Sequence, residues 1–152
     1  MSTTDRAEPK FVPLAVAVTL GFISINISPI LLGAVSDGMD LVESRAGLLT
    51  TMEVWAFAFC TLTVGPFAGA FPKRRTVLAA AVVVAIGHAC AAFSSNYTMV
   101  ALARIVAGLG EGMIVAMIYA IIAGTRNSQG NYGKAISINI AVGSLAYVLL
   151  PH

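Results

Sequence analysis

MVALARIVAGLGEGMIVAMIYAIIAG, residues Met99 to Gly124, is the stretch of sequence that decides the fold. Its 26 residues are almost all apolar, and as a helix they are long enough to cross the hydrocarbon core of a bilayer. Two charged residues, Arg104 and Glu111, nevertheless lie inside it. A charge at the centre of a membrane helix costs about 2.5–3.5 kcal/mol, so we expect protein or water to shelter both. Arg104, Gly108 and Glu111 follow i, i+4, i+7 spacing and share one helix face, which should point at other helices or at a water-filled cavity.

The composition of the whole chain is that of an integral membrane protein. Of the 152 residues, 58% are hydrophobic and only 11% are charged, whereas soluble domains carry about 25% charged residues. A net charge of +2, scattered along the chain, is too small to suggest a nucleic-acid partner. Cys60 and Cys90 lie inside apolar runs, which indicates buried hydrophobic side chains rather than a disulfide, a zinc site or a catalytic thiol. We expect neither a metal nor a cofactor.

The hydropathy pattern predicts an all-α membrane protein with about five transmembrane helices. Residues 1–10 are polar and are expected to form a short cytoplasmic tail, and residues 11–152 to form the transmembrane bundle. The expected spans are residues 11–35, 48–71, 76–93, 99–124 and 135–150. Pro29 should kink the first span and Gly65-Pro66 should bend the last third of the second. Residues 36–47 and 125–134 read as polar connections.

The distribution of Lys and Arg predicts the orientation, because cytoplasmic segments of membrane proteins carry the excess of these residues. With the N-terminus in the cytoplasm, only Arg45 is in an outer segment. The cytoplasmic segments then hold Arg6, Lys10, Lys73, Arg74, Arg75, Arg126 and Lys134. We therefore expect an N-terminus in the cytoplasm, with the basic residues Lys73–Arg75 in a tight inner loop that contacts anionic lipid. The expected location is the plasma membrane, the inner membrane of the cell.

This topology places three ionisable side chains at the same depth. Glu53 and Arg104 each follow the outer start of a span by five residues, and His88 precedes the outer end of another by five. At 1.5 Å per residue, all three lie roughly 7–8 Å below the outer helix ends, and Glu111 lies roughly 10 Å deeper than Arg104. One interpretation is a polar layer that binds an ion or solute or relays a proton. The other is a buried Glu53–Arg104 pair that only holds two helices together.

Two further side chains leave similar alternatives open. Asn26 either faces a solute pathway or bonds within the protein, since an amide in lipid needs a partner. Neighbouring hydroxyls such as Ser24 are expected to bond back to their own helix. For His88, among small residues (AIGHACAA), we expect a bond to a neighbouring backbone group.

Glycines at small-xxx-small spacing predict close helix packing. Gly108 and Gly112 form one such pair and Gly65 and Gly69 another, while Gly110 lies between the first two.

Three of these features together resemble the N-terminal half of a transporter of the major facilitator superfamily, over about residues 11–150. A span that runs inward is followed by a tight basic turn. The run GPFAGAFPKRR, residues 65–75, is similar to the family's loop motif G-x-x-x-D-R-x-G-R-R, with Gly69 at the acidic position, Ala70 at its Arg and Pro72 at its second Gly. RIVAGLG, residues 104–110, resembles the fourth-helix motif R-x-x-Q-G-x-G, with Ala107 in place of Gln.

The resemblance implies a bundle of three-helix inverted repeats, two such halves rocking around a central site. The run RIVAGLGEG, residues 104–112, is also similar to R-x-x-x-G-x-x-E-G of the family's organic-anion symporters. The fifth apolar run lacks the Gly-Pro pair of the antiporter motif. About twelve helices are expected in the family and five are predicted here, so we expect a truncated chain that lacks the C-terminal half, or short chains that associate.

The function that follows is the N-terminal portion of a secondary transporter for a small polar or anionic solute, coupled to a proton or cation gradient. Arg104, Glu111, Glu53 and Asn26 are the candidate substrate and coupling residues. The alternative is a non-transporting membrane subunit or adaptor, or a non-functional transporter fragment, with structural buried charges. A membrane-embedded enzyme ranks lower, because the sequence has no P-loop, no HExxH, no Gly-x-Ser-x-Gly and no cluster of histidines.

Overall fold

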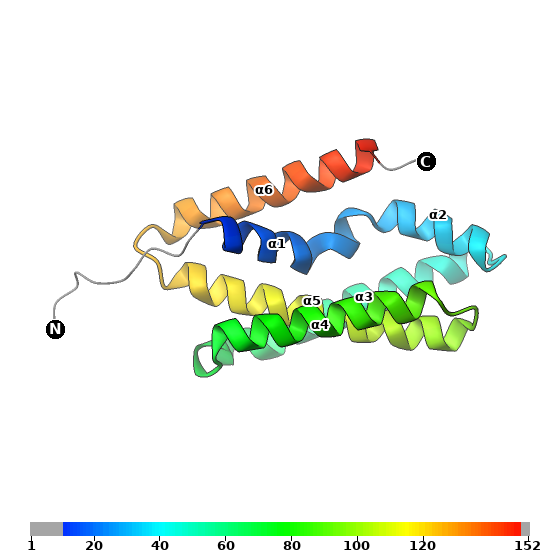
Figure 1. Cartoon of the computed structure of the whole chain (residues 1–152), viewed down its shortest axis with the longest axis horizontal. Coiled ribbons are helices and arrows are strands. Elements are labelled where there is room, and N and C mark those ends of the chain that lie inside the picture. The colour runs from blue at the N-terminus through cyan, green and yellow to red at the C-terminus, as the bar shows by residue number, and fades with distance from the viewer. Residues whose placement is uncertain (1–10, 150–152) are drawn as a thin grey trace.

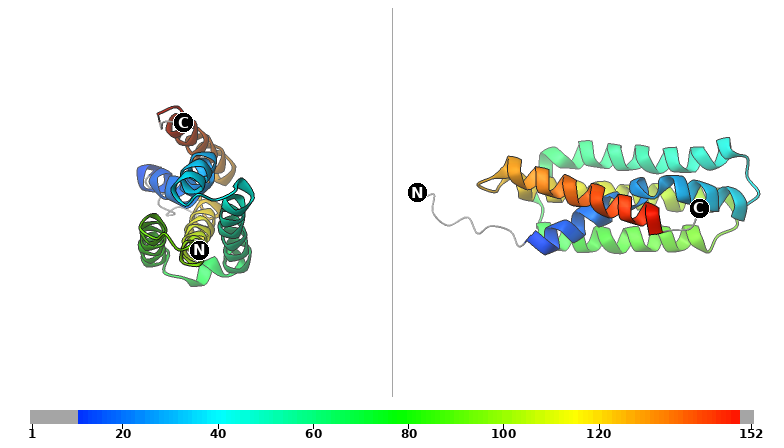
Figure 2. Two further views of the ribbon diagram at one scale, coloured as in Figure 1. Left: turned by 90° about the vertical axis from the view of Figure 1, so that its right-hand side faces the viewer. Right: turned by 90° about the horizontal axis from the view of Figure 1, so that it is seen from above.

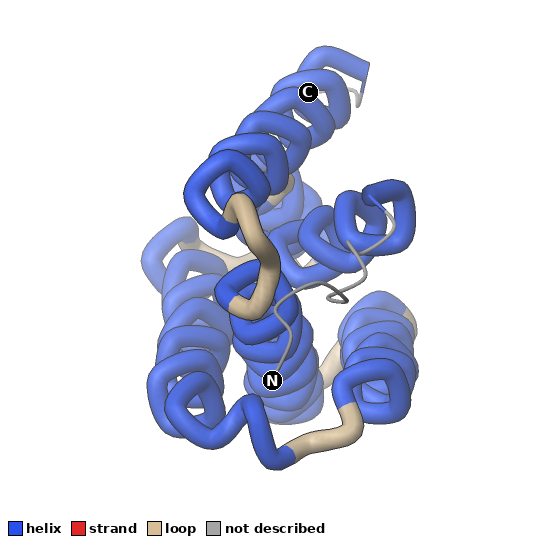
Figure 3. The backbone as a smooth tube through the Cα atoms, turned by 90° about the vertical axis from the view of Figure 1, so that its left-hand side faces the viewer, coloured by secondary structure: helices blue, strands red, loops and turns tan. Residues whose placement is uncertain are grey.

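The computed structural model describes residues 11–149, and over this range the chain is helical, without a strand (Figure 1, Figure 3). The elements are α1 (Phe11–Asn26), α2 (Ser28–Gly38), α3 (Glu43–Val64), the 3₁₀ helix η1 (Gly65–Ala70), α4 (Lys73–Ala92), α5 (Tyr97–Ala123) and α6 (Ser128–Leu149). Four spans, with α3 and η1 counted together, are long and apolar enough to cross a membrane, and the bent pair α1–α2 makes a fifth. The predicted all-α membrane fold is confirmed. The expected tail at residues 1–10 and the last residues, 150–152, lie outside the described range.

The first span is broken rather than continuous. α1 ends at Asn26, α2 begins at Ser28, and their axes differ by 49°. Pro29, in the first turn of α2, is the cause, since proline lacks an N–H and its ring clashes with the preceding turn of a continuous helix. The expected kink is present, and the helical segment runs on to Gly38.

The second and third spans are joined by only two residues, Phe71 and Pro72. The expected bend at Gly65-Pro66 takes the form of η1, which begins at Gly65. α4 begins at Lys73, so Lys73, Arg74 and Arg75 form its first turn instead of a separate loop. These three cations therefore lie at the positive end of the helix dipole, an unfavourable place for positive charge unless anions or water are near.

The last helix begins earlier than the polarity of the sequence suggests. α6 starts at Ser128, so most of the stretch 125–134, expected as a connection, is its first turns. Asn127 explains the early start, because its side-chain oxygen accepts a hydrogen bond from the Gly130 N–H at 3.0 Å. Such a cap satisfies one of the free N–H groups at the beginning of a helix.

α5 is the centre of the bundle. In its most apolar window 61% of the residues are buried, against 22% or less in the other long helices. It lies between α3 and α4, with α1 and α2 across it and α6 on the far side of α1 (Figure 2). The charge-bearing stretch, residues 99–124, is thus the one most enclosed by protein.

Glycines allow the helices to approach α5 this closely. A Cβ at Gly108 would collide with the backbone oxygen of Glu53, and one at Gly112 with that of Phe57, both on α3. A Cβ at Gly110 would lie 2.8 Å from Val84 Cγ2 on α4. Of these three glycines, two face α3 and one faces α4 at close approach, the geometry that small-xxx-small packing uses.

The second predicted glycine pair does not pack in this way. Nothing in the described part of the chain lies within 4 Å of a Cβ built on Gly65 or Gly69. Both residues belong to η1, whose 3₁₀ geometry presents Ala68 instead to the core formed with Ala116 and Met117 of α5. For Gly65 and Gly69 the prediction of close helix contact is therefore wrong within residues 11–149.

Candidate functional site

Arg104 of α5 and Glu53 of α3 form a buried ion pair. The guanidinium Nη1 donates to Glu53 Oε2 at 2.7 Å, and the two residues are 5% and 2% exposed. Gly108, one turn further along α5, lets the Glu53 backbone approach closely enough for this contact. Arg104 is therefore sheltered from lipid, as its position in an apolar span requires.

Glu111, also on α5, is enclosed by a second set of polar side chains. It is 0% exposed, and its Oε1 accepts a hydrogen bond of 2.6 Å from the Ser24 hydroxyl on α1. The Nε2 atom of His88, on α4, lies 3.3 Å from the same oxygen and 3.0 Å from Ser24 Oγ. The expectation that protein shelters Glu111 is confirmed as well.

His88 connects the two carboxylates. Its Nε2 atom is 3.3 Å from Glu111 Oε1 and 4.0 Å from Glu53 Oε1. Ser24 has one hydroxyl proton, which it donates to Glu111, so it must accept from His88. This assigns the ring proton to Nε2, directed at Ser24 and Glu111.

The five side chains, Ser24, Glu53, His88, Arg104 and Glu111, form one network, which we call the polar cluster. α1, α3, α4 and α5 each contribute to it. Within the described range, 11–149, three of its buried polar atoms have no hydrogen-bond partner: Glu53 Oε1, Glu111 Oε2 and Arg104 Nε. The two carboxylate oxygens among them are acceptors that a cation or a hydrogen-bond donor could satisfy, whereas Arg104 Nε is a donor.

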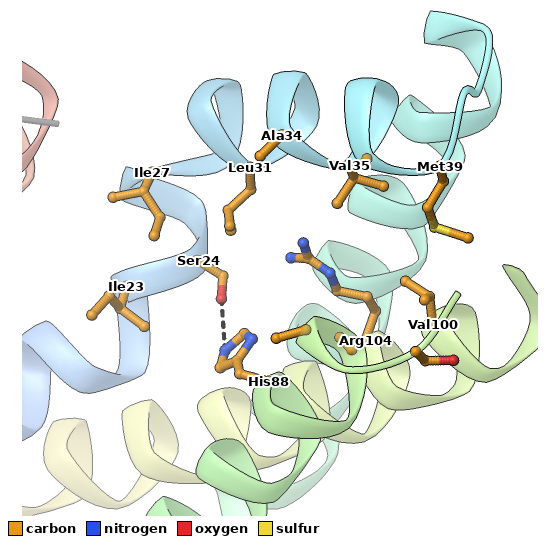
Figure 4. A pocket seen from close by; sticks show the side chains of 14 residues that line it. Ile23, Ser24, Ile27, Leu31, Ala34, Val35, Met39, His88, Val100 and Arg104 are labelled. Carbon is orange, nitrogen blue, oxygen red and sulfur yellow. Dashed lines mark hydrogen bonds between the residues drawn. The ribbon is translucent and has the colours of Figure 1, made fainter. Parts of the chain in front are cut away.

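A cavity of about 490 Å³ borders this cluster under the break between α1 and α2. Ser24, His88 and Arg104 are its polar wall near the cluster, and the Arg104 side chain extends toward α2 (Figure 4). The opposite wall is apolar, with Ile27 at the break and Leu31 and Val35 on α2. A volume of this size is within the range of small-molecule sites.

Two members of the cluster, His88 and Ser24, were expected to make local bonds. His88 was expected to bond a backbone group and Ser24 its own helix, and both predictions are wrong, because each contacts side chains of other spans. The signal for His88 was its depth, equal to that of Glu53 and Arg104. Ser24 carries no comparable signal, since a hydroxyl in a membrane helix usually bonds locally.

Glu111 meets the same cluster although its backbone was placed roughly 10 Å deeper than that of Arg104. Helix side chains lean toward the N-terminus of their helix, so Glu111 extends back toward the level of Arg104. His88 then bridges the remaining distance.

Asn26 lies outside the cluster. Its side-chain amide donates to Asn139 Oδ1 on α6 at 2.8 Å, and a Cβ at Gly143 would lie 2.9 Å from Asn26 Cγ. It is not among the residues that line the cavity beside Ser24. Of the two interpretations of Asn26, this geometry favours a bond that holds α6 against α1.

The basic residues of the connections gather at one end of the bundle. Lys73, Arg74 and Arg75 begin α4, and the start of α4 lies at the same end of the bundle as the α5–α6 connection, which contains Arg126 (Figure 1). Arg45 lies at the opposite end, where the Tyr97 hydroxyl donates to its backbone oxygen at 3.3 Å.

Comparison with known proteins agrees with this architecture. The family model for the Major Facilitator Superfamily matches residues 14–151, which covers nearly all of the helical bundle. No curated protein and no solved structure matches the chain significantly. Apolar helices with a buried polar cluster, together with this match, show an integral membrane protein of a solute-transporting type. The chain belongs to the Major Facilitator Superfamily.

Proposed function

We propose that this chain contributes its helical bundle to a secondary transporter that moves a small organic anion by alternating access, with a coupled cation. The observation that carries the proposal is Arg104, which is buried, lines the cavity and is paired with Glu53. A buried ion pair is weak evidence for stability, because desolvation offsets most of the attraction. The position of Arg104 at the cavity wall instead supports a role of this pair in solute handling.

The lining of the cavity supports a solute with one anionic end and an apolar body. A carboxylate is the group that a guanidinium binds best, through two parallel hydrogen bonds. Beyond Arg104 the wall offers aliphatic side chains, among them Ile27, Leu31 and Val35, and the hydroxyl of Ser94. The similarity of residues 104–112 to an organic-anion symporter motif points to the same class of solute.

Coupling follows from competition for Arg104. While Glu53 is ionised it holds Nη1 of Arg104 at 2.7 Å. A proton or another cation that enters the polar cluster weakens this pair and frees the guanidinium for the solute. Solute and cation then favour each other's binding, which is the linkage that symport requires.

Orientation and assembly complete the proposal. We propose that the basic end, with Lys73–Arg75, faces the cytoplasm of a plasma-membrane protein, where anionic lipid balances these charges. Alternating access in this fold uses two bundles, so we propose that a second bundle, the C-terminal half or another copy, closes the site.

A thermal-stability screen of the purified full-length protein tests the solute class. We expect small carboxylates with an apolar body to raise the melting temperature of the wild type, because a ligand that binds the native state stabilises it. The Arg104→Gln variant should lose this response, while Arg126→Gln, altered at an exposed Arg in a connection, should retain it. Stabilisation by neutral or cationic solutes alone, or an unchanged response in Arg104→Gln, would contradict the proposal.

A further inference from the structure

We infer that the polar cluster contains a binding site for a divalent transition-metal ion such as Zn²⁺, formed by Glu53, His88 and Glu111. One ligand atom from each of the three residues lies within 4.8 Å of the other two. The ligands come from α3, α4 and α5, far apart in the sequence, so no metal-binding spacing is visible there. This inference concerns binding only and does not depend on transport.

One unpartnered oxygen in particular supports a ligand at this place. Within residues 11–149, Glu53 Oε1 is buried without a hydrogen-bond partner, on a residue that is 2% exposed. Glu53 Oε1 lies 4.0 Å from His88 Nε2, so it is directed into the cluster and not toward Arg104. A buried carboxylate oxygen without a partner is costly, and a metal ion supplies the missing interaction.

The spacing fits a tetrahedral ion after a small contraction. With bonds of about 2.0–2.2 Å to His nitrogen and carboxylate oxygen, ligand atoms around Zn²⁺ lie roughly 3.4 Å apart. The His88 Nε2–Glu111 Oε1 distance is already 3.3 Å, and Glu53 Oε1 is 4.0 Å from His88 Nε2. Since the ligand atoms all lie within 4.8 Å of one another, Glu53 has to move closer to Glu111 by at most about 1.4 Å. Ser24 Oγ, 3.0 Å from His88 Nε2, or a water from the cavity can take the fourth position.

The surrounding bonds resemble those that orient metal ligands. Arg104 holds Glu53 through Oε2 and leaves Oε1 available, and Ser24 bonds Glu111. The metal replaces the proton on His88 Nε2, because the nitrogen must offer its lone pair. One imidazole and few oxygens favour Zn²⁺, Co²⁺ or Cu²⁺ over Ca²⁺, which takes six to eight oxygen ligands.

Arg104 stays outside the ligand set because a guanidinium has no lone pair to offer a metal. It remains beside the site as the group that holds Glu53 Oε2. Two carboxylates neutralise the divalent ion.

Titration of the purified full-length protein in detergent with CoCl₂ and ZnCl₂ tests the inference. We expect a visible absorption band of tetrahedral Co²⁺ at one equivalent, displaced by Zn²⁺. His88→Gln and Glu111→Gln should each weaken binding by at least about tenfold, since even the loss of an outer-shell partner has an effect of that size. Glu43→Gln, which removes an exposed carboxyl from α3, is the matched control and should bind as the wild type does.

Three outcomes would overturn the inference. The first is the absence of a Co²⁺ band in a folded, monodisperse protein. The second is a near-ultraviolet thiolate band, which would assign the metal to Cys60 or Cys90. The third is binding that survives in His88→Gln, the variant most certain to fold because His88 is only half-buried.

Discussion

The hydroxyl of Ser24 on α1 donates a 2.6 Å hydrogen bond to Glu111 Oε1 on α5. This contact joins the first span, just before its break, to the most buried helix of the bundle. In alternating access the helices at the cavity move relative to one another. A carboxylate that bonds another span beside the cavity changes its contacts when the two helices separate, which makes Glu111 our candidate for the group that links cation occupancy to movement.

Glu111→Gln should abolish gradient-driven accumulation of solute while leaving exchange across proteoliposome membranes. The amide keeps the size of the side chain and can still accept from Ser24, but it removes the negative charge that attracts the coupled cation. Accumulation and counterflow of labelled solute are measured side by side, with Glu43→Gln as the control. Full accumulation by Glu111→Gln would exclude it as the coupling group.

Gly108→Ala should destabilise the bundle by about 1–3 kcal/mol, which is the usual effect of overpacking. Its new methyl group would meet the Glu53 backbone oxygen and push α3 and α5 apart, together with the Glu53–Arg104 pair. The melting temperature in detergent measures the effect. Gly69→Ala, where nothing lies within 4 Å of the added carbon in the described structure, is the matched control and should change little.

Much of the fold could be predicted because membrane insertion makes hydropathy and charge decisive. The central position of residues 99–124 followed from two charges that lipid does not tolerate. Equal depth gave the Glu53–Arg104 pair as one of two interpretations. Helix rotation does not follow from composition, so the partners of Ser24, Asn26 and His88 depended on which faces meet. The start of α6 was not predicted, because a polar, capped first turn looks like a loop in sequence. The packing of Gly65 and Gly69 was predicted wrongly, because spacing alone does not distinguish α-helical from 3₁₀ geometry.

Single cysteines at Arg74 or Arg75 should react with an impermeant thiol reagent only from the cytoplasmic side, and a cysteine at Arg45 only from outside. All three residues are exposed, with Arg74 and Arg75 in the first turn of α4 at one end of the bundle and Arg45 in the first turn of α3 at the other. We expect the end with the excess of cations to face the cytoplasm. Labelling of intact cells and of inverted vesicles, in a protein with Cys60 and Cys90 replaced, measures the accessibility. Reaction at position 74 from outside would overturn the topology.

Asn26→Ala should lower thermal stability by about 0.5–2 kcal/mol, because an interhelical hydrogen bond in a membrane is worth about that much. Uptake per folded molecule should stay near the wild-type rate, since the amide bonds Asn139 and not the polar cluster. Asn139→Ala removes the same hydrogen bond and should lower thermal stability by the same amount. In the double variant this bond should contribute no further loss of stability. A strong fall in uptake for Asn26→Ala, with stability unchanged, would return Asn26 to the solute pathway.

Arg104→Ala should abolish uptake while the protein still inserts into the membrane. Removing the guanidinium takes away the anion-binding group and leaves the Glu53 carboxylate buried without its partner, a loss of about 3–5 kcal/mol when a buried pair is broken. Uptake and membrane content are measured together, and Arg126→Ala serves as the exposed-Arg control.

The double variant Glu53→Gln/Arg104→Gln tests most directly whether these charges exist for solute handling. It removes both charges at once, so no buried charge is left without a partner and the helices can remain packed. Uptake of a labelled solute by the reconstituted, monodisperse double variant is the measurement. We predict a folded, inserted and inactive protein; uptake at the wild-type rate would show that the pair only holds α3 against α5.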